Sequence, residues 1–211
     1  MARVRRELLD AATELRGRDR AFGWVIDRAG LPDLRRGRPR ADHFGELVRT
    51  VCYQQLAGAA ARAIHGRLLA SFDGAPTPEA VAARRLPALR AVGLSTSKAN
   101  TIRDLARHVV AGDVELDRVA RLPDDEIVRE LTLVKGIGPW TAEMFLIFQL
   151  GRLDVWPVED FGVRKGYGLI HRLDPPPTAR ALEPLGETYR PYRSVAAWYC
   201  WRAADTKLPV A

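Results

Sequence analysis

The sequence predicts an all-α fold, and three observations lead to that prediction. Apolar residues recur at helical spacing over almost all of the 211 residues, and strand patterns are nearly absent. Segments rich in glycine and proline interrupt this pattern at intervals. Hydrophobic residues make up 47% of the chain, which is enough for a folded core. The length suits one domain, or two small lobes that share a boundary.

The first third of the chain predicts four helices. The first runs from about Val4 to Arg16 and the second from about Arg20 to Ala29. The polar segment "GLPDLRRGRPR" is then a connector, because its prolines and glycines interrupt a helix. Asp42 is placed to cap the third helix, since its carboxylate can accept a free N–H group of the first turn. A short break near Gly58 separates the third helix from the fourth.

Shorter helices joined by turns are predicted for the remainder. "DGAPTPEAVAA" reads as a turn and a short helix whose first turn holds Pro78 and Glu79. "GLSTSKANTIRDLARHVVAG" predicts a loop, a helix and a glycine stop. Asp124 is expected to cap the next helix. The last helical stretches are Pro139 to Leu150 and about Tyr192 to Ala204.

The charge of the chain favours a polyanionic partner. The formal net charge is +7 and the sequence pI is about 9.9. Nucleic acid is therefore the first expectation and an acidic membrane surface the second. An ordinary basic enzyme remains the alternative, because charge alone does not separate these classes.

Several site classes find little support. Two cysteines, Cys52 and Cys200, cannot alone form a thiolate zinc site or hold an iron–sulfur cluster, and we expect both to be reduced core residues in a reducing cytoplasm. The four histidines show no metal-ligand spacing. The start "MARVRRELLDAATELRG" lacks an apolar core of signal-peptide length, and no run approaches a membrane span.

The turn "VKGIGPW" is the first candidate site. Gly136 and Gly138 can adopt positive φ and carry no side chain that would hold a ligand away. Pro139 suits a first helical position. The turn would thus present the N–H groups of residues 135–138 to an anion at a helix N-terminus, with Lys135 adding a charge. An ordinary helix–helix connector that needs glycine for its geometry is the alternative.

Several segments resemble one family in the right order. "LTLVKGIGPWTAEMFL" followed by "DVWPVEDFGVRKG" is similar to the hairpin and Gly/Pro–Asp segments of the helix-hairpin-helix–GPD superfamily of DNA glycosylases. "YQQLAG", "GLSTSKANTI" and the ending "PYRSVAAWYCWR" match further family segments. Within the superfamily, the chain most resembles the alkylation-repair branch of DNA-3-methyladenine glycosylase II. The resemblance covers roughly residues 40 to 204.

This resemblance implies a two-lobed helical bundle with a substrate cleft between the lobes. The whole chain, 1–211, would be a single glycosylase unit. One lobe would combine residues 1–42 with 153–211, and residues 43–152 would form the other and end in the hairpin. The bacterial enzyme of this branch also has an N-terminal mixed α/β domain, for which this chain is too short. Any part of the pocket that such a domain supplies would be missing or replaced.

The resemblance places the catalytic aspartate on Asp160. Cleavage of an N-glycosidic bond builds positive charge on the deoxyribose, and a fixed carboxylate can stabilise that cation or help a water to attack C1′. A plain N-terminal helix cap is the alternative role. Glu159 reads as a supporting or solvent-facing acid. Relatives that also cut the strand carry a Schiff-base lysine after the hairpin, where this chain has Trp140.

An aromatic base pocket also follows from the resemblance. Alkylated purines carry positive charge, and aromatic faces attract them by cation–π interaction, worth about 1–2 kcal/mol. Trp140 and Trp201 are the main wall candidates, and Tyr53 and Trp156 are the weaker ones. Core packing is the alternative for each of the four.

A base inside a duplex must rotate out before it can react, and a side chain usually fills the gap. The family position of this wedge falls on Leu56, with Gln55 beside it; a core leucine is the alternative. The loop "GLSTSKA" offers Ser95 and Lys98 as phosphate contacts. A helix cap and a solvated lysine are their alternative roles.

We expect no required cofactor and no catalytic metal. Hairpins of this family can bind a monovalent cation on backbone carbonyls, here those of Thr132, Val134 and Ile137. The sequence thus predicts a monomeric, monofunctional glycosylase, cytoplasmic and nucleoid-associated, that removes alkylated purines from double-stranded DNA in base excision repair. A glycosylase for oxidised, deaminated or mismatched bases and a non-catalytic helix-hairpin-helix DNA-binding module are the alternatives.

Overall fold

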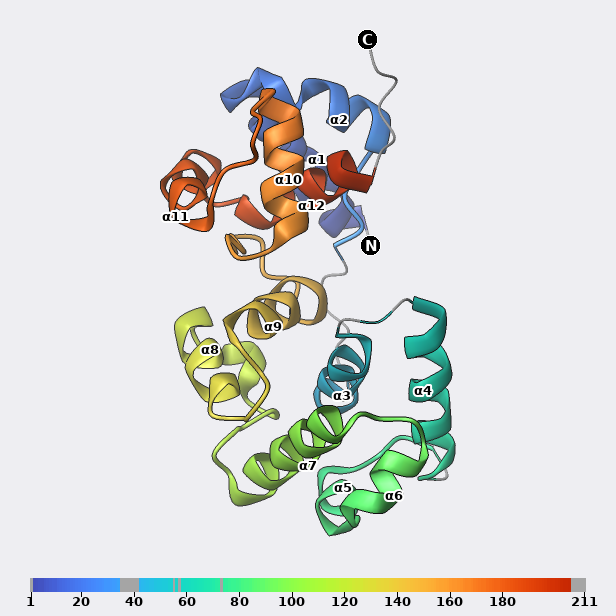
Figure 1. Cartoon of the computed structure of the whole chain (residues 1–211). Helices are drawn as coiled ribbons and strands as arrows, with labels where there is room; N and C mark the ends of the chain where they lie inside the picture. Colours follow the sequence, from blue (N-terminus) through green and yellow to red (C-terminus); the bar gives the residue numbers. More distant parts are fainter. Residues whose placement is uncertain (1, 35–41, 55, 57, 73, 206–211) are drawn as a thin grey trace. The chain divides into compact units, whose positions relative to one another are not determined.

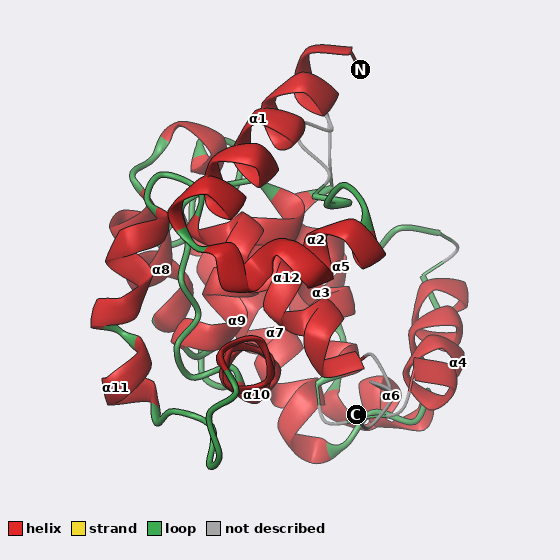
Figure 2. Ribbon diagram, turned by 90° about the horizontal axis from the view of Figure 1, so that it is seen from above, coloured by secondary structure: helices red, strands yellow, loops and turns green. Residues whose placement is uncertain are grey.

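The structure is a computed structural model that describes residues 2–34, 42–54, 56, 58–72 and 74–205 (Figure 1). Within these residues the secondary structure is helical throughout, with no strand, which confirms the all-α prediction (Figure 2). None of the described helices is both long and apolar enough to cross a membrane.

The chain divides into two compact units. Unit 1 combines Met1–Gly37 with Leu146–Ala211, and unit 2 is Arg38–Phe145. The lobe limits that the family resemblance implies, at residues 42 and 153, stay a prediction.

Unit 1 takes its helices from both ends of the chain: α1 (Ala2–Arg18), η1 (Arg20–Phe22), α2 (Gly23–Ala29), α10 (Phe161–His171), α11 (Ala179–Leu182), η4 (Pro184–Tyr189) and α12 (Arg193–Asp205). The π-helical turn η3 (Phe145–Gln149) begins at the last residue of unit 2 and continues into unit 1. In Figure 1 the blue helices α1 and α2 lie beside α10 and α12, and α12 contacts both α1 and α2.

Unit 2 is one continuous stretch of chain. It holds α3 (His43–Tyr53), α4 (Gly58–Ala70), α5 (Pro78–Ala83), α6 (Leu86–Ala91), α7 (Thr96–Ala111), η2 (Val119–Arg121), α8 (Asp124–Thr132) and α9 (Pro139–Met144). α7 contacts α3, α5 and α6. Its buried residues include Ile102 and Leu105, as expected for a helix that packs against several neighbours.

Capping residues explain several helix starts. Oδ1 of Asp42 accepts the N–H of Gly45 at 2.7 Å, which confirms the predicted cap of α3. The expected cap at Asp124 is wrong, because the N-cap of α8 is Pro123 and Asp124 is already the first helical residue. Its carboxylate still lies in the first turn, where the helix dipole favours negative charge.

The core of unit 1 is built around the contact between α10 and α12. A Cβ added at Gly166 would overlap the backbone carbonyl of Cys200, so only glycine lets the two helices approach this closely. The hydroxyl of Tyr199 donates to the carbonyl of Gly30 at 2.9 Å and connects α12 to the end of α2. Cys52 and Cys200 are both buried and unbridged, as predicted for core cysteines.

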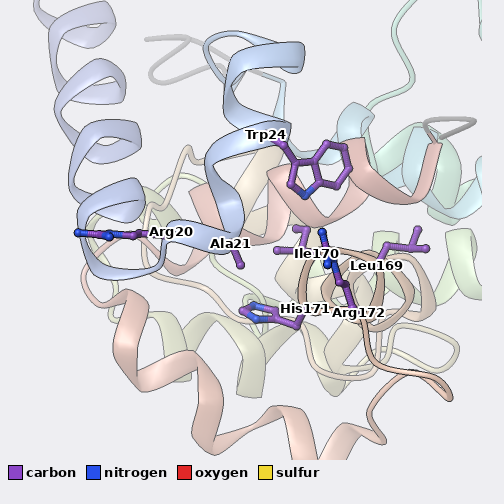
Figure 3. Close-up of a pocket in the computed structure, with 7 residues that line it drawn as sticks. All are labelled: Arg20, Ala21, Trp24, Leu169, Ile170, His171 and Arg172. Carbon is purple, nitrogen blue, oxygen red and sulfur yellow. The ribbon is translucent and has the colours of Figure 1, made fainter. Parts of the chain in front are cut away.

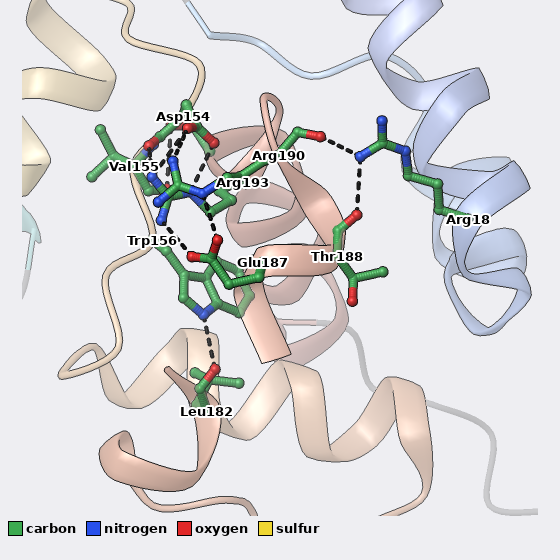
Figure 4. Close-up of polar contacts among 10 residues, drawn as sticks. Arg18, Asp154, Val155, Trp156, Leu182, Glu187, Thr188, Arg190 and Arg193 are labelled. Carbon is green, nitrogen blue, oxygen red and sulfur yellow. Dashed lines mark hydrogen bonds and ion pairs between the residues drawn. The ribbon is translucent and has the colours of Figure 1, made fainter. Parts of the chain in front are cut away.

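A polar cluster in unit 1 fixes the segment that leads to Asp160 (Figure 4). Asp154 accepts hydrogen bonds from the guanidinium groups of Arg190 and Arg193, each at 2.7 Å. The N–H of Val155 donates to Oγ of the buried Ser194 at 2.9 Å. These bonds tie residues 154 and 155 to the start of α12, and α12 also carries Trp201.

Candidate functional site

The carboxylate of Asp160 is the N-cap of α10. Its Oδ1 accepts the N–H of Val163 at 2.8 Å and the indole Nε1–H of Trp201 at 2.8 Å. Asp160 is half-buried, while the neighbouring Glu159 is exposed. Two N–H donors and a helix N-terminus together stabilise a negative charge on this oxygen and fix the orientation of the side chain.

Gly162 makes the contact between Trp201 and Asp160 sterically feasible. A Cβ at this position would lie 2.8 Å from Cδ1 of Trp201 and 3.0 Å from Oδ1 of Asp160. Any larger residue would therefore push the indole away from the carboxylate. The sequence prediction missed Gly162; the only available signal was a glycine two residues after the aspartate.

Two exposed aromatic side chains of unit 1 are neighbours of this carboxylate or of its partner Trp201. Phe148 packs against Trp201 with ring centroids 5.4 Å apart and planes inclined by 32°, and its side chain is 43% exposed. Phe161, next to Asp160 in the chain, is 64% exposed. Phe148 lies in the π-helical turn η3, a type of irregularity that is frequent at functional sites. The sequence could not single it out, because "MFLIFQL" reads equally well as a core helix.

Trp156 occupies a different environment. It is only 7% exposed, and its Nε1–H donates to the carbonyl of Leu182 at 3.1 Å (Figure 4). Its ring packs against Tyr167 and Tyr189, and a Cβ added at Gly186 would overlap the indole. This is the core packing that was the alternative for Trp156.

Unit 2 contains the predicted helix–glycine turn–helix, formed by α8, residues 133–138 and α9. Gly136 has φ = +90°, and a Cβ there would overlap Oγ1 of Thr101 on α7. Gly136 therefore needs to be glycine for both conformation and space. Gly138 has φ = −97°, so it does not use the positive φ that a glycine can adopt. Pro139 is the first residue of α9, as predicted.

The backbone amides of the turn are not all available to a ligand. The N–H of Lys135 donates to Oδ2 of Asp104 at 2.9 Å, and the N–H of Ile137 donates to the carbonyl of Val134 at 3.0 Å. This corrects the expectation that the amides of all four residues are free. Across the described parts of the chain, the amides of Gly136 and Gly138 have no hydrogen-bond partner. The side chain of Lys135 is exposed beside them.

The predicted wedge region lies next to this hairpin in unit 2. Leu56 is 41% exposed, whereas Gln55 falls outside the described residues. Nε2 of Gln54 donates to Oγ1 of Thr141 at 3.2 Å and to the carbonyl of Gly136 at 3.4 Å. Gln54 was not among the predicted site residues, although it stands in the segment "YQQLAG".

Lys98 and Ser95 have structural partners. The ammonium of Lys98 donates to the carbonyls of Cys52 and Gln54, at 2.8 and 2.7 Å, and burial lowers the pKa of this lysine. Oγ of Ser95 accepts the N–H of Lys98 at 3.2 Å and caps α7. The helix cap that was the alternative for Ser95 is thus present. Lys98 is not the solvated lysine that was its alternative, because its ammonium is held by the end of α3, and its phosphate contact stays a prediction.

The two remaining wall candidates lie in unit 2. Trp140 is in the first turn of α9 and is 37% exposed. Tyr53 is half-buried, and its ring is close to the guanidinium of Arg49, with 5.3 Å from Cζ to the ring centroid. Tyr53 also meets His65 edge-on at 6.4 Å. The exposed surface of Trp140 is therefore the more accessible of the two.

A separate pocket of about 680 Å³ lies at the other end of α10 (Figure 3). Its lining residues are Arg20, Ala21, Trp24, Leu169, Ile170, His171 and Arg172. Asp160 caps the opposite end of this 11-residue helix, which at about 1.5 Å per residue is roughly 16 Å away. The pocket is therefore distinct from the carboxylate site.

Metal ligands do not gather in the described residues, where no group of three or more His, Cys, Asp or Glu side chains could hold an ion. Unit 1 presents a fixed carboxylate beside exposed aromatic surface. Such a carboxylate can stabilise a cation that forms next to it, and the aromatic faces can stack on a flat ring.

Comparison with known proteins agrees with this chemistry. Residues 48–191 match the model of the HhH-GPD superfamily base excision DNA repair protein. DNA-3-methyladenine glycosylase 1 of Schizosaccharomyces pombe is 35% identical over 209 residues, which is 96% of this chain and 92% of that protein. The solved complex of the S. pombe 3-methyladenine DNA glycosylase with abasic DNA has a TM-score of 0.79 at 35% identity, and the match covers 91% of this chain and 95% of the solved one.

A second solved structure is comparably similar. The DNA-3-methyladenine glycosidase of Bacillus halodurans has a TM-score of 0.82 at 34% identity, and the match covers 93% of this chain and 89% of the solved one. The family model covers more than half of the chain, and it includes the hairpin and Asp160. The chain therefore belongs to the HhH-GPD superfamily of base excision DNA repair proteins.

Proposed function

We propose that the chain is a monofunctional DNA glycosylase that removes alkylated purines, of the 3-methyladenine and 7-methylguanine type, from double-stranded DNA. The observation that carries the proposal is the carboxylate of Asp160, which Val163 and Trp201 hold at the N-terminus of α10. The names of the yeast and Bacillus relatives support the class of substrate. The product is an abasic site for base excision repair.

The carboxylate acts on the sugar rather than on the base. As the C1′–N bond breaks, its electron pair leaves with the purine and the deoxyribose becomes an oxocarbenium ion. Asp160 stabilises this cation, and it can also accept a proton from the water that attacks C1′. An alkylated purine is already cationic, so it departs as a neutral base and needs little help as a leaving group.

Trp201 has two tasks in this proposal. Its N–H holds Oδ1 of Asp160, and its ring, together with Phe148, offers a surface on which a flipped base can stack. A cationic base gains about 1–2 kcal/mol from such a face. Trp140 is proposed as a further wall because it is exposed on α9. Tyr53 stays a weaker wall candidate, whereas Trp156 has the core packing described above.

The chain lacks a nucleophile for strand cleavage at the position where bifunctional relatives carry a lysine, because Trp140 follows the sequence GIGP there. Lys98, the lysine nearest the predicted wedge in sequence, has its ammonium bound to two backbone carbonyls. Water therefore attacks C1′ of the sugar, and the strand stays intact.

Unit 2 supplies the contacts with DNA in this proposal. The amides of Gly136 and Gly138, together with the side chain of Lys135, bind backbone phosphates, which fix register without reading sequence. Leu56 is the wedge that fills the gap left by the flipped nucleotide. A chain with this substrate would work on the chromosome, so we expect it in the nucleoid.

A monovalent cation on the carbonyls of Thr132, Val134 and Ile137 would support the hairpin. Carbonyl oxygens suit such an ion, and the carbonyl of Val134 keeps a lone pair in addition to the one that accepts the N–H of Ile137. The cation would add positive charge near a bound phosphate. Its removal should loosen DNA binding and leave the glycosidic step unaffected.

Base release from methylated DNA tests this function. Duplex DNA treated with a methylating agent is incubated with the protein, and the released bases are separated and identified. We expect 3-methyladenine and 7-methylguanine, with strand breaks that appear only after alkali. Release of oxidised or deaminated bases from a matched panel would favour the other glycosylase class. Tight binding with no release from any duplex would favour the non-catalytic module.

A further inference from the structure

Lys98 reaches from the first turn of α7 to the end of α3. Its ammonium donates to the carbonyl of Cys52 at 2.8 Å and to that of Gln54 at 2.7 Å. The last carbonyls of a helix have no partner within the helix, and a cation there also complements the helix dipole. Lys98 therefore closes the C-terminus of α3 from a neighbouring helix.

Partial burial of the Lys98 ammonium costs desolvation free energy. Burial disfavours the charged form of Lys98 and lowers its pKa. Hydrogen bonds to two carbonyls offset that cost. Two of the three N–H groups of the ammonium are taken by these carbonyls, which leaves it poorly placed to bind a phosphate.

Gln54 continues the same connection toward the hairpin. Its backbone carbonyl is held by Lys98, and its side-chain amide donates to Oγ1 of Thr141 and to the carbonyl of Gly136. Thr141 is buried in α9, and Gly136 is the residue of the turn with positive φ. Three elements, α3, α7 and the hairpin, thus meet at one glutamine.

Leu56 stands two residues after Gln54 and is exposed. A wedge can enter a duplex only if its distance from the phosphate contacts is fixed, since a loose side chain must be ordered at the expense of binding energy. The bonds of Lys98 and Gln54 fix residue 54, two residues before Leu56, relative to the hairpin. The side chain of Gln54 is bonded to the hairpin, whose amides bind the phosphates in the proposed function.

We infer that Lys98 and Gln54 are positioning residues that hold the wedge Leu56 in a fixed place relative to the hairpin. This inference rests on the proposed function, because it assumes that Leu56 enters the duplex. In this role both residues act through Leu56 and the hairpin rather than by contact with the substrate. Their loss should therefore impair insertion of the wedge, while the number of phosphates bound by the protein stays the same.

Insertion can be measured without catalysis. A duplex carries an abasic-site analogue with 2-aminopurine as the neighbouring base, and the fluorescence of 2-aminopurine rises when it is unstacked. Wild-type protein should raise the signal on binding, and Leu56→Ala should not. We expect Lys98→Met and Gln54→Leu to give a signal close to that of Leu56→Ala, although both bind the duplex. Circular dichroism checks that each variant is folded. If Lys98→Met is unfolded, Gln54→Leu alone tests the inference.

The salt dependence of binding distinguishes positioning from a phosphate contact. Each phosphate contact contributes about 0.9 to the slope of log K against log salt concentration. We expect the slope of Lys98→Met to equal that of the wild type. A slope smaller by about 0.9 would identify Lys98 as a phosphate contact and overturn the inference, as would an undiminished fluorescence signal in Lys98→Met or Gln54→Leu.

Arg107→Met is the matched control for loss of charge, because Arg107 is an exposed cation on the same helix. Its fluorescence signal should be that of the wild type; a loss in this variant would show a general effect of charge and contradict the positioning role. A wild type that gives the signal but releases no base would refute the proposed function and leave this inference standing. If the wild-type protein gives no rise in fluorescence, Leu56 does not enter the duplex, and the inference is refuted.

Discussion

Replacement of Gly162 by alanine should separate the indole of Trp201 from Asp160 without removing either residue. The new Cβ would lie 2.8 Å from Cδ1 of Trp201, where carbon contacts are normally 3.4 Å or more. The ring must therefore move by about 0.6 Å, the difference between these distances, and Cβ also crowds Oδ1 of Asp160 at 3.0 Å. The 2.8 Å hydrogen bond between the two side chains is the contact that gives way.

The size of the effect follows from that bond. A hydrogen bond to a charged group contributes about 1.5–3 kcal/mol, and about 1.4 kcal/mol corresponds to a factor of ten in rate. If the bond matters for the orientation of the carboxylate in the transition state, Gly162→Ala should slow base release by roughly 10- to 150-fold. Trp201→Phe, which keeps a ring but removes the N–H, should show a loss of similar size, and the double variant should lose less than the two losses combined.

Single-turnover release of 7-methylguanine from a methylated duplex, with enzyme in excess, measures this step directly. Gly17→Ala is the control, because Gly17 lies in α1 of the same unit and a Cβ there meets nothing within 4 Å. Its rate should match the wild type. A folded Gly162→Ala variant that releases base at the wild-type rate would refute the orienting role of Trp201.

Three further predictions concern binding and stability. Gly136→Val should weaken binding to damaged and undamaged duplexes by the same factor, on the order of tenfold, because it disturbs a phosphate contact; a loss confined to damaged DNA in titrations would contradict this. Trp156→Ala should lower the free energy of unfolding by about 3–5 kcal/mol in urea, and a loss below about 1 kcal/mol would argue against a core role. Burial lowers the pKa values of His43, His65 and His171 below the ordinary value of about 6.5, so the unfolded chain takes up protons first as the pH falls. Stability should therefore decrease between pH 7.5 and pH 5.5, and an unchanged urea midpoint would contradict this.

The helices could be predicted because their apolar spacing is a local property of the sequence. Asp42 was correctly expected to cap α3, since an acidic residue before an apolar pattern is a usual helix start. Asp124 was not a cap, because the backbone turns into the helix one residue earlier, at Pro123. A shift of one residue of this kind depends on backbone angles that the sequence pattern does not determine.

The site could be predicted only in part. The segment that resembles the family identified Asp160, but its partner Trp201 lies 41 residues away and the bond between them is a tertiary contact. Lys98 looked like a surface lysine in a polar loop, and only the packing of α7 against α3 shows that it closes a helix. Phe148 resembled a core residue because exposure is not a property of local sequence.

The account depends most on the negative charge of Asp160, and the paired substitutions Asp160→Asn and Glu159→Gln test it most directly. Both replace a carboxylate by an amide of the same shape at adjacent positions, but only Asp160 is held by Val163 and Trp201, while Glu159 is exposed. In single-turnover release of methylated purines, Asp160→Asn should be slower than wild type by at least about a hundredfold with DNA binding retained, and Glu159→Gln should keep the wild-type rate. Equal rates for Asp160→Asn and the wild type would contradict the account.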